Sequence, residues 1–207
     1  DGSWRTAGSG TANDVYRVTF RAPLSEITAL KLEALTDDTL PKGGPGLASN
    51  GNFVLGEVTL SSAAGVLALD GAWADHSQSG FDIAGAIDGR DDTAWAINVD
   101  SGSLNVNRTA VFATTTGLPT NGAEPLTVEL HFAHKDPSYL LGRFRLSVSD
   151  ARRDVVLLAP AVREALEIPR GERTKEQQQA IAAAYRELDS SWRAANAAVR
   201  VAANQLH

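Results

Sequence analysis

The pattern of apolar and polar positions changes character near residue 150. Before that point the two kinds of residue alternate with a period of two in short runs, most clearly in Tyr16–Phe20, Leu126–Phe132 and Arg143–Val148. Successive side chains of a strand point to opposite faces of its sheet, so this alternation is typical of strands with one buried face. Similar but less regular runs predict four more strands, at Thr28–Leu35, Phe53–Leu60, Val66–Leu69 and Ala110–Ala113.

Clusters of Gly, Pro, Asn and Asp separate these runs, as they do in antiparallel sandwiches and barrels. Long loops are expected at Thr36–Asn52, Asp75–Gly80 and Thr115–Pro125. About eight short strands over this length predict a mainly β fold, a jelly-roll β-sandwich, for residues 1–150.

Residues 151–207 show helical periodicity instead. A short helix is expected near Ala161–Ile168, and Thr174 with Gln177 forms a capping box that starts a second helix at Lys175. Two interpretations of this helical extension remain open: it packs wholly on the β domain, or it reaches a partner helix beyond the chain's end or in another copy. The second helix carries a coiled-coil heptad seam with alternating steps of four and three, made by Ile181, Tyr185, Leu188, Trp192, Ala195, Val199, Ala202 and Leu206.

The composition is that of a folded protein, with 43% apolar and 21% charged residues, and it includes no cysteine and no methionine. The lack of cysteine excludes disulfides, thiolate nucleophiles and the C-x-x-C-H attachment of c-type haem, so we expect no haem in this chain. The lack of methionine suggests a module processed or cut from a longer protein. No apolar run approaches the roughly 18 residues that a membrane-spanning helix needs.

The net charge of −6 is unevenly distributed. Residues 1–150 contain 10 basic and 18 acidic side chains, whereas residues 151–207 contain 9 basic and 7 acidic ones. A nucleic-acid ligand requires clustered cations, so the acidic body makes nucleic acid an improbable partner.

A group of polar and aromatic residues on an expected loop is the best candidate for ligand recognition. Sugar recognition uses aromatic faces together with planar polar side chains. Trp73 with Asp75, His76 and Gln78 forms the densest such group, and Tyr139 is a further aromatic candidate. The alternative for each aromatic residue is a packing role at the edge of the fold.

The sequence contains no nucleophile elbow, no H-E-x-x-H and no phosphate-binding loop, so we expect no enzymatic activity. His131 and His134 lie three positions apart, which places them on opposite faces of a strand and argues against a shared metal. His131 shares its face with Glu129, which predicts a solvated sheet residue.

One stretch, AIDGRDDTAW at Ala86–Trp95, resembles the A-I-D-G-x-x-x-T-x-W motif of galactose-binding-like jelly rolls, the discoidin-type domains and related carbohydrate-binding modules. The resemblance implies an oxygen-rich turn that encloses a structural Ca²⁺, with Trp95 in the core. The implied ligands are Asp88, Asp91, Thr93 and, in an order that looks permuted, Glu57. The alternative is a turn that caps itself with Asx-type hydrogen bonds and holds no metal.

A second, ordered set of segments resembles the central region of large planctomycete-type cytochrome c proteins. The resemblance implies an exported module, periplasmic or at the cell surface, with haem and conserved domains of the parent chain as neighbours. Together the two resemblances imply non-catalytic binding of a polysaccharide, and the alternative is an interdomain scaffold without a small ligand. The segments are Asp1–Ser3, Asp14–Tyr16, Ile27–Leu35, Gly44–Leu55, Leu141–Val148 and Arg173–Gln177.

Overall fold

The computed structural model describes residues 1–7, 10–11, 13–120 and 122–188. The protein is mainly β, with 37% strand and 19% helix, and its sheets are antiparallel, as the alternating runs predict. The chain divides into two compact units, Asp1–Leu157 and Leu158–His207. No helix among the described residues is long and apolar enough to cross a membrane.

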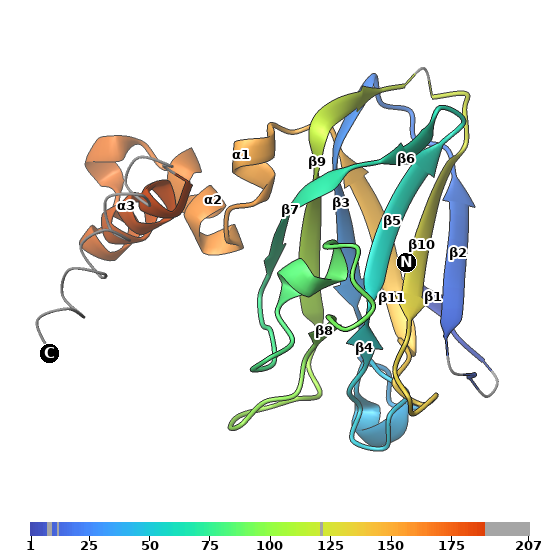
Figure 1. The fold of residues 1–207 in the computed structure, drawn as a ribbon. Helices are drawn as coiled ribbons and strands as arrows, with labels where there is room; N and C mark the ends of the chain where they lie inside the picture. The colour runs from blue at the N-terminus through green and yellow to red at the C-terminus, as the bar shows by residue number, and fades with distance from the viewer. Residues whose placement is uncertain (8–9, 12, 121, 189–207) are drawn as a thin grey trace, which may run out of the picture. The chain divides into compact units, whose positions relative to one another are not determined.

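The first unit contains two larger sheets and one short two-stranded ribbon (Figure 1). The five-stranded sheet has the order β1 (Trp4–Arg5), β11 (Arg143–Ser149), β3 (Glu26–Ala34), β9 (Arg108–Pro119) and β7 (Leu69–Ala74). The four-stranded sheet has the order β2 (Asp14–Phe20), β10 (Leu126–Phe132), β5 (Glu57–Ser62) and β6 (Gly65–Leu67). The ribbon pairs β4 (Val54–Leu55) with β8 (Trp95–Ala96).

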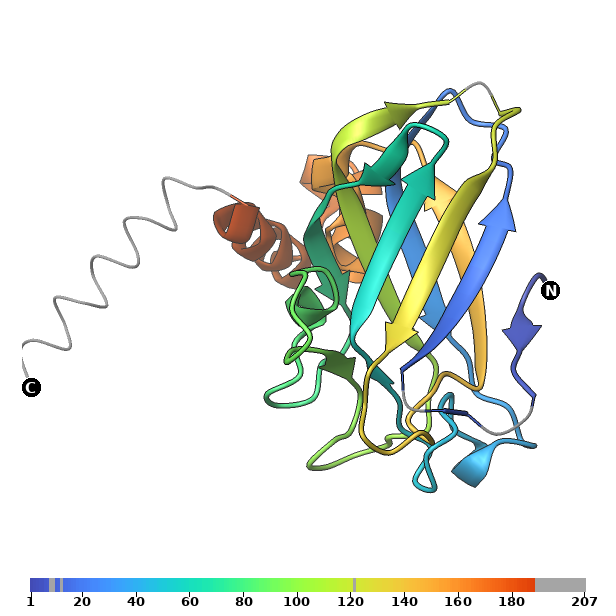
Figure 2. The ribbon, with the colours of Figure 1, turned by 45° about the vertical axis from the view of Figure 1, so that its right-hand side comes forward.

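The two larger sheets face each other across one apolar core (Figure 2). Leu30 and Phe112 of the five-stranded sheet are buried in the same cluster as Leu60 and Val128 of the four-stranded sheet. Burial alternates along β10 with a period of two, so the opposite side chains of this strand lie on the outer face of its sheet.

Several expected elements have different bounds in the structure, and the expected strand Val66–Leu69 is divided between β6 and β7. The expected strand Phe53–Leu60 breaks at Gly56, because β4 pairs with β8 while β5 pairs with β10. The expected loop Thr115–Pro125 is wrong over its first half, since β9 continues to Pro119 and pairs with β3 beyond an irregularity in register. The polar run of threonines near the end of β9 hides this continuation in the sequence.

A short helix, α1 (Arg153–Val156), covers part of the outer face of the five-stranded sheet. Its Val156 packs with Ala29, Val111 and Ala113 in a second, smaller apolar cluster. Two 3₁₀ turns, Pro41–Gly43 and Ile83–Ala86, lie in the loops of this unit.

The second unit contains α2 (Pro160–Glu167), a 3₁₀ turn at Arg170–Glu172 and α3 (Lys175–Leu188), with α2 and α3 in contact. The predicted capping box is present: Gln177 N donates to Thr174 Oγ1 at 3.2 Å, and Thr174 N donates to Gln177 Oε1 at 2.9 Å. The heptad positions from Trp192 to Leu206 lie outside the described residues.

Candidate ligand-binding groove

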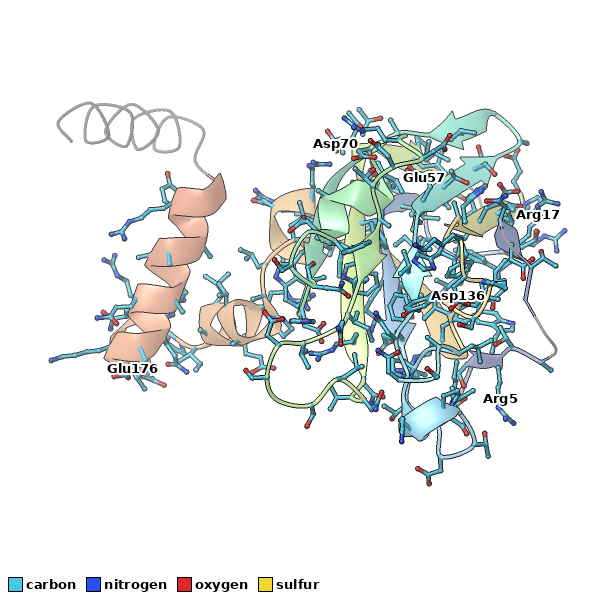
Figure 3. All side chains as sticks on the ribbon, turned by 60° about the horizontal axis from the view of Figure 1, so that its bottom comes forward. Arg5, Arg17, Glu57, Asp70, Asp136 and Glu176 are labelled. Atoms are coloured by element: carbon cyan, nitrogen blue, oxygen red, sulfur yellow. The ribbon has the colours of Figure 1, made fainter. Side chains whose placement is uncertain are left out.

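The outer face of the four-stranded sheet presents ordered rows of polar side chains. Strand register places His131 of β10 opposite Val15 of β2 on one side and opposite Glu57 of β5 on the other. In the next row Glu129 lies between Arg17 and Thr59. Figure 3 shows Glu57 and Arg17 on the two strands that flank β10.

The turn that resembles the galactose-binding motif lies against this face and is joined to β5. Gly89 adopts a positive φ of 71°, which favours glycine, and its N–H donates to Glu57 Oε2 at 3.1 Å. Asp88 Oδ1 accepts hydrogen bonds from Arg90 N at 3.0 Å and from Thr93 Oγ1 at 2.8 Å. The turn is therefore closed by Asx-type hydrogen bonds of its own, and Glu57 is the residue that ties it to the sheet.

A cavity of about 380 Å³ opens between this turn and the start of β2, and we call it the groove. Its polar lining comes from Asn13, Asp14, Glu57, Thr59, Arg90, Asp91 and His131. A smaller hollow of about 130 Å³ adjoins it, since both are lined by Gly56, Asp91 and Ala133. The volume of the groove lies within the range of small-molecule sites, roughly 300–1,000 Å³.

The carboxyl groups around the groove have distinct electrostatic environments. Burial, and then the neighbouring charges of Asp88 and Asp91, raise the pKa of Glu57 against the opposing hydrogen bond from Gly89. Hydrogen bonding from Arg17, at 2.7 Å, lowers the pKa of Glu129. His131 Nε2 lies 3.2 Å from Glu129 Oε2, so a chain of polar contacts runs from Arg17 through Glu129 to His131.

The four residues expected to bind calcium come together in part. Glu57, Asp88 and Asp91 are close enough for their charges to interact, and Thr93 is bonded to Asp88. Their oxygens suit a hard cation. Glu57 Oε2 and Asp88 Oδ1, however, already accept hydrogen bonds from the turn. Over the described part of the chain, no three or more His, Asp or Glu side chains are grouped so as to hold a metal ion.

The expected position of Trp73 on a loop is wrong, because Trp73 lies within β7. Its flanking residues Ala72 and Ala74 face the main core, so Trp73 points to the outer face of the five-stranded sheet. There it packs against the small cluster that contains Val156 of α1. Trp73 is thus an aromatic residue with a packing role, which is the alternative that the sequence left open.

The polar residues that follow Trp73 are engaged with neighbouring loops. His76 Nε2 lies 3.0 Å from the carbonyl oxygen of Asn98, and Gln78 Oε1 accepts from the N–H of Asn98 at 3.1 Å. Burial raises the pKa of Asp75. His76 and Gln78 thus contact a neighbouring loop, whereas Trp73 packs on the outer face of the five-stranded sheet.

Tyr139 lies on the connection between β10 and β11, apart from Trp73. Its ring lies 4.4 Å from the ring of His134, centroid to centroid, with a tilt of 49°. His134 lines the smaller hollow, so this ring pair belongs to the surroundings of the groove. Tyr139, one of the five residues expected to bind sugar, is thus placed next to a residue that lines a hollow.

Sequence reasoning missed the groove because it treated His131 as a solvated sheet residue. The alternation along Leu126–Phe132 does place Glu129 and His131 on one outer face. The strand order that brings Glu57 beside His131, however, depends on contacts between segments some 70 residues apart. A single sequence contains no signal for that register.

Comparison with protein-family models, with curated proteins and with solved structures finds no match to this chain.

Proposed function

We propose that the first unit is a non-catalytic polysaccharide-binding module of the galactose-binding-like jelly-roll type, and that the groove is its binding site. The observation that supports this most directly is the cavity of about 380 Å³ on a polar sheet face, with several hydrogen-bonding side chains directed toward it. The two resemblances in the sequence supply the class of ligand. They also supply the setting, an exported multidomain protein whose haem lies in a neighbouring domain.

The chain connections support the jelly-roll assignment. The chain leaves the four-stranded sheet after β2, returns to it for β5, and crosses again between β6 and β7. It crosses twice more, from β9 to β10 and from β10 to β11. Repeated crossing between two facing antiparallel sheets is the connectivity of Greek-key sandwiches, to which jelly rolls belong.

The side chains of the groove suit the hydroxyl-rich surface of a sugar. The carboxylates of Glu57 and Asp91 accept hydrogen bonds from hydroxyl groups, and charged acceptors make the stronger bonds. Val15, 44% exposed, offers an apolar contact beside the imidazole ring of His131. No catalytic motif accompanies these groups in the sequence, so binding without turnover is the activity we propose.

Substitution of His131 by alanine is expected to weaken retardation by a polysaccharide in affinity electrophoresis about threefold to tenfold. The change removes one polar contact and one ring face from the floor of the groove, and single polar contacts are worth about 0.5–1.5 kcal/mol. The panel should include neutral, amino and acidic polysaccharides, and circular dichroism should confirm that each variant is folded.

Thr19→Ala is the matched control, because Thr19 lies on the same face two rows away and pairs with Thr127. It is expected to leave retardation unchanged. Trp73→Ala tests the loop site that the sequence suggested. Loss of binding in Trp73→Ala but not in His131→Ala would move the site to the other sheet, and no retardation by any polysaccharide would refute the proposal.

We propose a structural calcium ion at Glu57, Asp88, Asp91 and Thr93 as the second element of this function. Burial raises the pKa of Glu57 most, and the charges of Asp88 and Asp91 raise it further; the ion would relieve that second, repulsive contribution. A ligand that binds only the folded state stabilises it, by about 1.4 kcal/mol at ten times its dissociation constant. Calcium is therefore expected to raise the melting temperature by about 3–6 °C, and EDTA to reverse the rise.

The variant Asp88→Asn should abolish this calcium-dependent shift, whereas Asp100→Asn, an exposed acidic position with the same change of charge, should retain it. Identical melting curves in calcium and in EDTA would contradict the structural ion. The polysaccharide proposal does not depend on this result, because the hydrogen bonds of Asp88 close the turn by themselves.

An interdomain scaffold is the second candidate, and the surface of α3 favours it. Tyr185 occupies a predicted heptad position, yet 67% of it is exposed. An exposed aromatic residue at such a position is available to a partner helix, as in a coiled coil. A scaffold without a ligand of its own would bind to no polysaccharide, so the electrophoresis experiment separates the two candidates.

A further inference from the structure

The groove is lined by more acidic than basic side chains, and the basic ones are already paired with carboxylates. Asp14, Glu57 and Asp91 contribute carboxylates, and Arg90 and His131 are the basic side chains. Arg90 donates two hydrogen bonds of 2.9 Å to Asp92, and His131 contacts Glu129 at 3.2 Å. Both basic groups are therefore already held by carboxylates of their own.

The carboxylates of the groove, by contrast, have few hydrogen-bond partners and no salt-bridge partner among the described residues. Glu57 is partly buried and accepts a hydrogen bond from the N–H of Gly89. Asp91, in the wall shared with the smaller hollow, forms no hydrogen bond or ion pair within the described residues. Asp14 is held by Thr11 through the backbone N–H, at 3.0 Å, and through the hydroxyl. The unmatched charge in the groove is negative and lies mainly on Glu57 and Asp91.

This charge distribution discriminates among sugars. A uronate or a sulfate would bring a further negative charge toward Glu57 and Asp91, and no unpaired cation of the groove would meet it. A neutral sugar would leave those charges unmatched. A protonated amine supplies three donors and a positive charge, and hydrogen bonds between ionised partners are about twice as strong as neutral ones.

We infer that the groove selects glycans with free amino groups, of the glucosamine type, through contacts of the ammonium group with Glu57 and Asp91. The inference rests on the proposed polysaccharide-binding function and names the class of sugar that this function would select. The ammonium group and the calcium ion proposed above would be alternative occupants of Glu57 and Asp91, so each would compete with the other. The cavity supplies the space for the sugar. Because Arg90 and His131 are already paired with carboxylates, the groove favours a positively charged sugar over a negatively charged one.

The test compares two oligosaccharides that share one β-1,4-linked hexamer backbone and differ only in N-acetylation. Isothermal titration calorimetry of the full chain is run in EDTA, so that no divalent cation occupies the carboxylates. The free-amine hexamer is expected to bind about tenfold more tightly than the N-acetylated hexamer, the size of effect of a hydrogen bond between charged groups. An oligogalacturonate of equal length is expected to bind more weakly than either.

The variants Asp91→Asn and Glu57→Gln should each reduce the affinity for the free-amine hexamer about threefold to tenfold, with little effect on the N-acetylated one. Asp100→Asn removes the same charge from an exposed position outside the groove and should leave both affinities unchanged. A loss in Asp100→Asn equal to that in Asp91→Asn would show unspecific attraction to the acidic protein and would overturn the inference.

Equal binding of the two hexamers, or preference for the acetylated hexamer or for oligogalacturonate, would also overturn the choice of ligand class while leaving polysaccharide binding in place. Binding of no glycan, in this experiment and in the electrophoresis panel, would instead refute the proposed function itself. The two failures are therefore distinguishable.

Discussion

Substitution of Trp95 by alanine is expected to lower the free energy of unfolding by about 3–5 kcal/mol, as large-to-small changes of buried aromatic residues do. Trp95 is fully buried, and its ring meets that of Phe53 edge to face with centroids 5.1 Å apart. Its Nε1 donates to the carbonyl oxygen of His76 at 3.0 Å. The change therefore opens a cavity and also removes the partner of a loop carbonyl. Chemical denaturation followed by circular dichroism measures the loss.

Trp4→Ala is the matched control for this measurement. Trp4 is 42% exposed and stacks on Phe144 at 5.6 Å, so its removal leaves no enclosed cavity. We expect a loss of about 1 kcal/mol, the value of one aromatic pair with a little buried area. A loss for Trp95→Ala no larger than that for Trp4→Ala would contradict the role of Trp95 as the centre of this part of the core.

The burial of Trp95 was predictable from the sequence, but its hydrogen bond to His76 was not. The resemblance of Ala86–Trp95 to galactose-binding-like motifs implies a core tryptophan, and the structure confirms this single residue as buried. The hydrogen bond to His76 depends on how two loops meet, which no local pattern encodes. The sequence therefore predicts a ligand-binding role for His76, whereas in the structure its carbonyl oxygen accepts from Trp95 and its ring contacts the carbonyl oxygen of Asn98.

Alternation predicted most of the strands because it reflects a local cause, the burial of one face. Along Leu126–Phe132 each apolar residue is buried and each polar one lies outside, as expected. Trp73 shows where this reasoning fails: the expected strand ends at Leu69, yet Trp73 lies in a strand and packs against the small cluster that contains Val156 of α1. Burial does not alternate along β7, where every residue except the exposed Asp70 is partly buried.

The groove was unpredictable for a related reason. Glu57, Asp91 and His131 come from a strand, a turn and a second strand, and their proximity follows from strand order and register. Register is set by many weak contacts across the sheet rather than by the residues that line the cavity. The sequence did indicate the turn itself, because Asp88 accepts hydrogen bonds from Arg90 and Thr93, which lie within five positions of it.

Substitution of Asn52 by leucine is expected to cost about 2–4 kcal/mol, although Asn52 lies at the end of a segment predicted as a loop. Asn52 is 4% exposed, and its side chain joins three segments. Oδ1 accepts from the N–H of Ile97 at 3.1 Å, and Nδ2 donates to Gln78 Oε1 at 3.3 Å. Because Ile97 is fully buried, leucine would leave its N–H without a partner, at a cost of about 1–3 kcal/mol before the second bond is counted.

The variant Asn52→Asp separates the lost hydrogen bonds from the change of shape. An ionised aspartate still accepts from Ile97 but cannot donate to Gln78, whereas a protonated one retains a donor. Burial raises the pKa of such a carboxyl in the folded state. Its folded state then binds more protons than the unfolded state, so stability is retained below the unfolded pKa and is lost as the pH rises through the folded one. Asn52→Leu has no titrating group and should show the same loss at every pH.

Asn98→Ala is the control for both variants, since Asn98 is exposed and contributes its backbone groups to this network. We expect a change within about 0.5 kcal/mol for this exposed position. Denaturation curves at pH 4 and pH 7 measure all three variants. If Asn52→Leu costs less than about 1 kcal/mol, the amide of Asn52 does not hold these loops together, and the bonds to Ile97 and Gln78 are replaceable by packing alone.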